Sequence, residues 1–235
     1  MKVKGLIFDF GGTLDTNGLH WSEVLWDGYC SAGIEVSKEH FREAYVHAER
    51  ALARKPLIQP HYTMLDMLRI KVDIETLYLL ENGYWNANNS KRELLVEVVA
   101  RLCYDDAQAT VETSRMVLRR LSEHYPLVLV SNFYGNMNAV LHDFKLEIFQ
   151  TVVESARVGV RKPDPAIFQL GVEALGMKPE EVTVIGDSYK KDILPAVSLG
   201  CKTIWLRGKG WEEETIDESL PDAVIGHITE LLNIL

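Results

Sequence analysis

Short runs of apolar residues recur through the second half of the chain, and each ends at polar residues or glycine. They are rich in valine, isoleucine and aromatic residues, which is typical of buried β-strands. The runs are 125–132, 149–155, 181–188, 201–208 and, as a candidate sixth strand, 222–226. An apolar run at the N-terminus, residues 2–10, has the same character. The hydropathy pattern therefore predicts up to six strands.

Helical patterns fill the intervals between these strands. They cover 111–124, 135–144, 164–176 and 190–200, with a terminal helix after the last strand. Gly176 and Gly200 close two of them as C-cap signals. Strands that alternate with helices in this way favour a parallel sheet with crossover helices on both faces. The expected fold class is α/β, with a doubly wound, Rossmann-like parallel sheet.

Residues 17–105 break this alternation because their apolar positions follow a helical period. One stripe is Phe41, Tyr45, Ala48 and Leu52, and another is Leu94, Leu95, Val98, Val99 and Leu102. Pro56 and Pro60 separate the helices. We expect two domains, a catalytic α/β core of residues 1–16 plus 106–235 and an inserted all-helical cap of residues 17–105. An insertion directly after the first strand would hang over the carboxyl ends of the strands.

Composition narrows the classes of partner. Apolar residues make up 47% and charged residues 25% of the 235 residues, as in an ordinary soluble protein. The net charge of −9 argues against nucleic acid as a partner. Three widely spaced cysteines form neither a disulfide framework nor a zinc motif. No apolar run is long enough for a signal peptide or a membrane span, so we expect a cytoplasmic monomer or homodimer without a membrane partner.

Polar side chains stand where the predicted strands end. These residues are Asp9 at the end of the first run, Ser131 and Asn132 at the end of the second, Lys162 before a helix, Asp187 at the end of the run 181–188, and Asp192 five residues further on. In an open parallel sheet, ligands bind at the carboxyl ends of the strands. We therefore expect these side chains to converge on one site.

The chemistry of this set points to phosphoryl transfer. Three carboxylates repel one another unless a cation or protons intervene, and Mg²⁺ binds one or two carboxylates together with phosphate oxygens. A lysine and a hydroxyl suit a phosphoryl group. The glycines after Asp9 let backbone N–H groups approach a bound anion. The residues thus indicate a Mg²⁺-assisted site with Asp9 as nucleophile.

Four segments in this order carry a family resemblance. The segments "FDFGGTL", "VLVSN", "KPDPAIF" and "VIGDSYKKD" resemble the motifs of the haloacid dehalogenase-like hydrolase superfamily. The resemblance covers residues 1–16 and about 108–210, roughly half of the chain. The helical block at 17–105 resembles, by its position, the mobile helical cap of the C1-type subgroup.

The resemblance implies roles for single residues. Asp9 would form an aspartyl intermediate and, with Asp187, ligate Mg²⁺, while Gly11 would offer its backbone carbonyl to the metal. Asp192 would support the metal or orient Lys162. The residues expected to hold the transferring group are Ser131 and Lys162. The remaining candidate substrate-binding residues are Gly12, Thr13, Asn132 and His20, and Thr13 would also stabilise the turn.

The chain departs from the family pattern at Gly11. Most phosphatases of the family carry a second aspartate there, which protonates the leaving oxygen and then activates water. Losing a positioned acid–base group costs about 10²–10⁴-fold in rate. The interpretation we favour is a phosphatase for a small phosphorylated metabolite with a good leaving group, or with His20 as proton source.

Two alternatives stay open at this point. The first is a dehalogenase or a phosphonate-cleaving enzyme, the latter using a cap lysine as a Schiff base. The candidate lysines are Lys38, Lys55 and Lys71. The second is a binding module that keeps the metal and anion pocket but turns over slowly. We also expect Arg50 and Arg54 to lie on a solvated helix face and the acidic segment 211–223 to form a surface loop.

Overall fold

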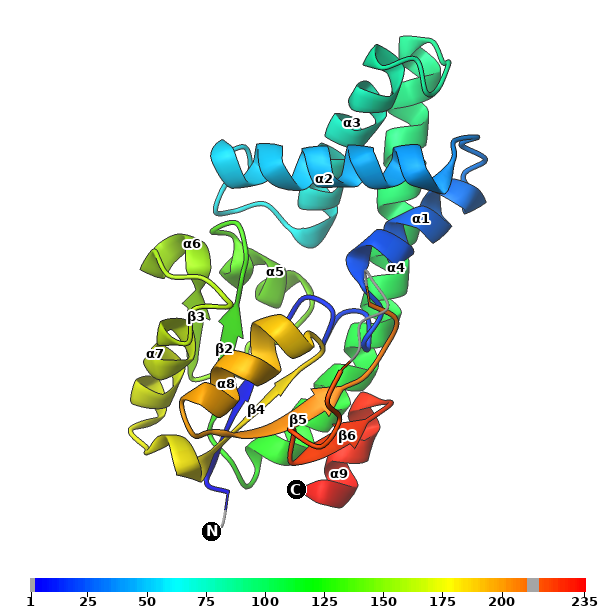
Figure 1. The fold of residues 1–235 in the computed structure, drawn as a ribbon. Helices are drawn as coiled ribbons and strands as arrows, with labels where there is room; N and C mark the ends of the chain where they lie inside the picture. Colours follow the sequence, from blue (N-terminus) through cyan, green and yellow to red (C-terminus); the bar gives the residue numbers. More distant parts are fainter. Residues whose placement is uncertain (1–2, 211–215) are drawn as a thin grey trace.

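A parallel sheet with helices on both sides forms one part of the molecule, and a block of long helices extends from it (Figure 1). The computed structural model describes residues 3–210 and 216–235. The described part of the predicted acidic loop, 216–223, consists mostly of exposed turns, and 211–215 lie outside the described residues. No helix among the described residues is both long and apolar enough to cross a membrane.

The sheet confirms the predicted fold class. Its strands are β1 (Gly5–Phe8), β2 (Leu127–Ser131), β3 (Thr151–Glu154), β4 (Val182–Gly186), β5 (Lys202–Leu206) and β6 (Ala223–Ile225). All neighbouring strands pair in parallel in the order β3-β2-β1-β4-β5-β6. The strand order reverses between β1 and β4, so the switch point, where such sheets bind ligands, lies there.

Alternate residues of the strands pack into two apolar layers. Leu6 and Phe8 of β1 lie in the layer on the α4 side, whereas Ile7 packs in the layer formed by α7 and α8. The shorter helices are α5 (Met137–Asp143), α6 (Ser155–Val158), α7 (Ala166–Leu175), α8 (Leu194–Ser198) and α9 (Leu231–Ile234). The 3₁₀ turns η1 (Pro179–Glu181) and η3 (Ile228–Glu230) and the π turn η2 (Tyr189–Ile193) complete this part. Because both faces are covered, the strands read as continuous apolar runs.

The helical block consists of α1 (Trp21–Ser31), α2 (Lys38–Arg54), α3 (Met64–Glu81) and the first half of α4 (Asn89–Ser122). Side chains of Ser37, Thr63 and Asn88 cap α2, α3 and α4. The predicted stripe on α2 is buried throughout, as expected. The predicted stripe on α4 is partly wrong, because Leu94 is 63% exposed. The face of α4 that packs inward is Val96, Val99, Ala100, Cys103 and Ala107.

Helix α4 also corrects the predicted element boundaries. It runs without a break for 34 residues, so the predicted helix at 111–124 is its C-terminal part. The segment between the two predicted helices contains no glycine or proline and is rich in alanine and other residues that tolerate a helix, so nothing ends it there. The predicted domain boundary at 105/106 therefore falls inside a helix that belongs to both parts.

Candidate active site

Three carboxylates meet at the switch point of the sheet. Asp9 follows β1, and Asp187 and Asp192 follow the neighbouring strand β4. One oxygen from each of the three lies within 4.8 Å of the other two. The sheet topology alone brings them together, since β1 and β4 are adjacent in space but about 175 residues apart in sequence.

Lys162 lies between two of these carboxylates. Its ammonium donates to Asp9 and, over 2.7 Å, to Asp192 Oδ1. Burial opposes the charge on Lys162, but Asp192 and Asp9 outweigh burial and raise its pKa above the usual range. The lysine therefore stays protonated, and one positive charge faces three carboxylates.

The pKa values of Asp187 and Asp192 reflect the burial of several carboxylates around one lysine. Burial and the charges of Asp9 and Asp192 raise the pKa of Asp187 well above its usual value. Burial raises the pKa of Asp192 to about 6, although Lys162 acts in the opposite direction. A hard divalent cation would relieve this repulsion, and oxygen donors of this kind are those that Mg²⁺ prefers.

The loop that follows Asp9 completes an oxygen-rich cradle. The Thr13 hydroxyl lies 3.1 Å from Asp9 Oδ2 and 2.9 Å from Asp187 Oδ1, and it accepts the Asp187 amide over 3.0 Å. The Gly11 carbonyl accepts no hydrogen bond from any residue in the described part of the chain. This carbonyl is thus available to a metal, and the residues present fit Mg²⁺ held by Asp9, Asp187 and Gly11.

Two glycines are required by close approach, and a third is not. Gly12 has a φ of +98°, and a Cβ there would overlap the Asp187 carboxylate. A Cβ at Gly186 would lie 2.5 Å from the Asp192 carboxylate carbon. A Cβ at Gly11, in contrast, would meet nothing within 4 Å. The side chain missing at Gly11 is therefore not excluded by space.

The end of β2 brings two further predicted residues to this edge of the sheet. Ser131 is the last residue of β2 and is 1% exposed. Asn132 accepts the Lys162 amide over 2.9 Å and donates to the Lys162 carbonyl over 3.1 Å. Both polar atoms of the Asn132 side chain are thus used to hold the backbone of Lys162. This role is additional to the contact with substrate that the sequence predicts.

Comparisons with known proteins identify the family of this chain. The family model described as haloacid dehalogenase-like hydrolase matches residues 3–200. The chain is a member of the haloacid dehalogenase-like hydrolase family. The hydrolase is 33% identical to a phosphoglycolate phosphatase of Photorhabdus laumondii subsp. laumondii over 98% of this chain and 92% of the relative.

Other relatives match over shorter stretches. A glyceraldehyde 3-phosphate phosphatase of Pyrococcus furiosus is 37% identical over 38% of each chain. A phosphoserine phosphatase of Thermus thermophilus is 36% identical over 35% of this chain and 32% of its own length. The hydrolase thus spans about a third of the length of these two relatives.

Solved structures show the same fold. The HAD-hydrolase YfnB of Bacillus subtilis, solved bound to magnesium, has a TM-score of 0.60 at 18% identity, covering 100% of this chain and 99% of its own. A dehalogenase solved with an intermediate complex has a TM-score of 0.65, also at 18% identity, covering 100% and 97%.

His20 begins the helical block of the hydrolase as the N-cap of α1. Its Nδ1 accepts the Ser22 amide over 3.1 Å, which places the ring proton on Nε2. Burial, followed by the charges of Lys191 and Lys71, lowers the pKa of His20 to about 4. His20 is therefore neutral near pH 7, which counts against the predicted role as a proton source.

A second buried lysine lies in the helical block, and the ion pair that it forms was not predicted from the sequence. Lys71 of α3 forms an ion pair with Glu49 of α2 and lies 4.2 Å from the centre of the Tyr45 ring. Tyr134, two residues beyond Asn132, donates to Glu49 Oε1 over 3.1 Å. The cluster therefore joins the helical block to the end of β2.

The lysines considered for a Schiff base do not have the required environment. Burial opposes the charge on Lys71, but Glu49 outweighs it and raises the pKa of Lys71 above its usual range. Lys38 is bound to Glu23 over 2.7 Å, and Lys55 is exposed at the end of α2. An amine nucleophile needs a lowered pKa, so the raised pKa of Lys71 opposes its use as the Schiff-base lysine of a phosphonate-cleaving enzyme.

Sequence reasoning missed Asp15, which lies six residues after Asp9. Its side chain is completely buried and accepts hydrogen bonds from the Gly12 amide and from Trp21 Nε1, over 2.7 and 2.9 Å. Burial raises the pKa of Asp15 to about 7, although both hydrogen bonds act in the opposite direction. A carboxylate within a glycine-rich turn is the signal that could have found it.

Arg50 and Arg54 are exposed, as expected.

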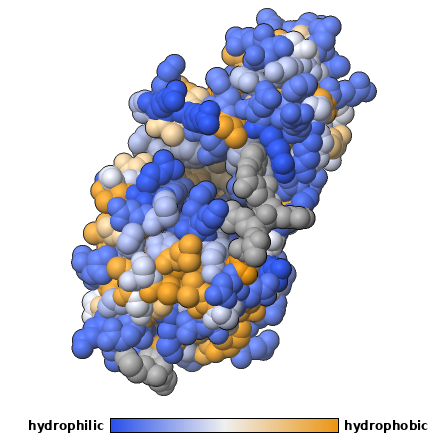
Figure 2. All heavy atoms as spheres, viewed as in Figure 1, coloured by the Kyte–Doolittle hydropathy of each residue, from blue (hydrophilic) through white to orange (hydrophobic). Residues whose placement is uncertain are grey.

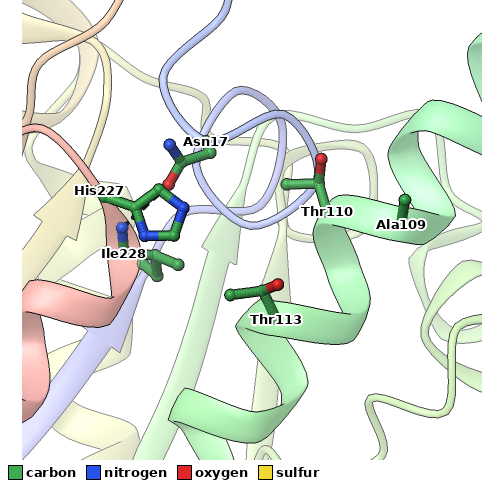
Figure 3. Close-up of a pocket in the computed structure, with 6 residues that line it drawn as sticks. All are labelled: Asn17, Ala109, Thr110, Thr113, His227 and Ile228. Carbon is green, nitrogen blue, oxygen red and sulfur yellow. Dashed lines mark hydrogen bonds between the residues drawn. The ribbon is translucent and has the colours of Figure 1, made fainter.

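A separate hollow of about 350 Å³ has none of the site carboxylates in its lining (Figure 3). It is lined by Asn17, Ala109, Thr110, Thr113, His227 and Ile228. The Asn17 side chain accepts the Ile228 amide over 2.9 Å and so joins the first loop to the C-terminal segment. Its lining contains neither a carboxylate nor an ammonium group, so it offers no phosphoryl-transfer chemistry.

Proposed function

We propose that this hydrolase is a Mg²⁺-dependent phosphatase that transfers the phosphoryl group of a small phosphorylated metabolite to Asp9. The observation that carries the proposal is the buried cluster of three carboxylates around one protonated lysine at the switch point. The relatives named as phosphoglycolate, phosphoserine and glyceraldehyde 3-phosphate phosphatases support the same class of reaction.

The proposed role of each residue follows from the charge and the hydrogen-bonding groups of its side chain. An Asp9 carboxylate oxygen attacks phosphorus and the bond from phosphorus to the leaving oxygen breaks, so that the leaving group departs as an anion and takes any proton from water. Water then hydrolyses the aspartyl-phosphate, which releases phosphate and restores Asp9. Lys162 and the Ser131 hydroxyl would hold the oxygens of the transferring group. Mg²⁺, when bound, would neutralise charge that develops on that group. Asp192 would keep Lys162 in place, since it accepts from the lysine over 2.7 Å.

Gly11 limits which substrates would react quickly. No side chain at this position can protonate the leaving oxygen or activate the water that hydrolyses the aspartyl-phosphate. The neutral His20 is a poor acid near pH 7. We therefore favour acyl or anomeric phosphates, whose leaving groups need little protonation.

The helical block would act as a cap over this site. Figure 2 shows the surface hollowed between the block and the sheet-bearing part. We propose that residues 17–105 form the cap and residues 1–16 plus 106–235 the catalytic core, with α4 shared between them. Contacts between the two parts, such as that of Tyr134 with Glu49, would set the closed form of the cap.

A substrate panel tests the proposed function. We expect the wild-type protein to release phosphate from acyl phosphates only when Mg²⁺ is present and to lose this activity with EDTA. Asp9→Asn keeps the shape of the side chain but removes its nucleophilic charge, so activity should fall by about 10⁴-fold or more. Phosphoenzyme should accumulate on wild-type protein and not on the variant, as measured by acid-quench labelling.

Two results would count against the proposal. Retained activity in Asp9→Asn would remove Asp9 as nucleophile. Mg²⁺ binding without phosphate release from any substrate would instead favour the alternative of a metal- and anion-binding module.

A further inference from the structure

Asp15 connects two parts of the molecule through its two carboxylate oxygens. Oδ1 accepts the Gly12 amide of the nucleophile loop over 2.7 Å, and Oδ2 accepts Nε1 of Trp21, the first residue of α1, over 2.9 Å. The side chain is fully buried, so water offers neither oxygen an alternative partner. Both hydrogen bonds are therefore needed to satisfy the buried group.

The bond to Gly12 determines the direction of a neighbouring carbonyl. The peptide between Gly11 and Gly12 is trans, because the cis peptide bond found in the described chain is elsewhere. In a trans peptide, the N–H and the C=O point in opposite directions. Since the Gly12 N–H points to Asp15, the Gly11 carbonyl points away from it.

The same peptide lies against the carboxylate cluster. A Cβ on Gly12 would overlap the Asp187 carboxylate, which places this backbone at the edge of the cluster. The Gly11 carbonyl accepts no hydrogen bond within the described residues, so no interaction on its own side fixes it. Within this peptide, the hydrogen bond that holds its orientation is that of the Gly12 N–H to Asp15.

We propose that Asp15 is a positioning residue that aims the Gly11 carbonyl at the Mg²⁺ site by holding the Gly12 amide. The inference rests on the proposed function in one respect, the assignment of the Gly11 carbonyl as a metal ligand. Residues that orient metal ligands typically contribute about 10–100-fold to metal affinity.

Asp15→Asn tests the proposal with almost no change in shape. Asparagine has one acceptor oxygen, whereas Gly12 and Trp21 present two donors, so its NH₂ group must face one of them. We expect Mg²⁺ affinity, measured by isothermal titration calorimetry in the absence of substrate, to fall by about 10–100-fold. Circular dichroism and a thermal melt would establish that the variant is folded.

A second variant provides control and rescue. Trp21→Phe removes one donor and leaves the Gly12 bond intact, so its Mg²⁺ affinity should stay near that of wild type. In the double variant Asp15→Asn with Trp21→Phe, the asparagine oxygen can face Gly12 without placing its NH₂ group against the indole. We expect the double variant to recover most of the lost affinity, a result that a general loss of stability would not produce.

Three outcomes would overturn the proposal. These are wild-type Mg²⁺ affinity in Asp15→Asn, no recovery in the double variant, and no Mg²⁺ binding by the wild-type protein. If Asp15→Asn does not fold, the double variant decides, since near-wild-type affinity in it supports the proposal and weak affinity contradicts it. Wild-type protein that binds Mg²⁺ but releases no phosphate would contradict the proposed function alone, because calorimetry measures binding without turnover.

Discussion

The hydrolase contains two buried lysines that differ in the charge around them. We call Lys162 with Asp9, Asp187 and Asp192 the core cluster, and Lys71 with Glu49, Tyr45 and Tyr134 the cap cluster. Both lysines are almost fully buried and held protonated by carboxylates.

The difference lies in the balance of charge. The core cluster sets three carboxylates against one ammonium, which leaves a surplus that a divalent cation can neutralise. The cap cluster pairs the Glu49 carboxylate with one ammonium beside the Tyr45 and Tyr134 side chains, and the pKa of the neighbouring Glu75 is raised to about 7. Burying a lysine against a carboxylate is thus not sufficient to form a metal site; what the core cluster adds is an excess of oxygen donors.

The largest expected effect comes from replacing each lysine in turn, which tests whether only Lys162 takes part in catalysis. Lys162→Met should lower kcat/KM by about 10²–10³-fold, because it removes a donor to the transferring phosphoryl group. Lys71→Met is the matched control, with the same substitution at a buried lysine that does not contact Asp9, and it should keep kcat/KM within the same order of magnitude. Steady-state kinetics on one acyl phosphate compares them, and equal losses in both variants would contradict the distinction.

Gly11→Asp sharpens the comparison by adding a fourth carboxylate to the core cluster. The site has room, since a Cβ at Gly11 meets nothing within 4 Å and φ there is not positive. We expect turnover of alkyl phosphates to rise by about 10²-fold, because the new side chain can protonate the leaving oxygen. Acyl phosphates should gain less, as their leaving groups need less protonation.

Gly11→Asn separates acid–base chemistry from shape. It has the size of aspartate but no titratable proton, so it should give no gain on alkyl phosphates. An unchanged or lower rate in Gly11→Asp, measured by phosphate release, would contradict the inference that the missing acid limits the reaction.

The smallest expected effect concerns the carboxyl group of Glu75, which interacts electrostatically with Lys71 of the cap cluster. Glu75 is fully buried and accepts from the Tyr29 hydroxyl over 3.1 Å, while its Oε1 has no partner within the described chain. Burial raises the pKa of Glu75 to about 7, although Lys71 and Tyr29 act in the opposite direction. The folded state therefore holds a proton that the unfolded chain releases at lower pH.

The sign of the pH dependence follows from this proton. As pH rises from the unfolded pKa near 4.5 to the folded pKa near 7, the free energy of unfolding should fall by up to about 3 kcal/mol. Glu75→Gln removes this loss, so its advantage over wild type should grow between pH 5 and pH 8 in urea unfolding. Glu81→Gln, at an exposed position at the end of α3, is the control. A constant difference across pH would contradict the assignment.

The core cluster could be predicted from the sequence to a large extent. Asp9, Asp187 and Lys162 follow or precede recognisable elements of an alternating pattern, and the carboxyl ends of parallel strands share one edge of a sheet. The cap cluster could not be predicted in this way. Lys71, Glu49 and Tyr134 lie on two helices and a loop, and helical periodicity shows which face is buried but not which neighbour it meets.

The sequence by itself determined the order of strands and helices, the position of the helical insertion and the residues that end the strands, because these depend on local periodicity and chain direction. The tertiary structure alone decided that Asn132 holds the backbone of Lys162 and that Tyr134 donates to Glu49 of the helical block. These donors and acceptors lie 30 and 85 residues apart in the sequence, and local pattern carries no information about such pairs.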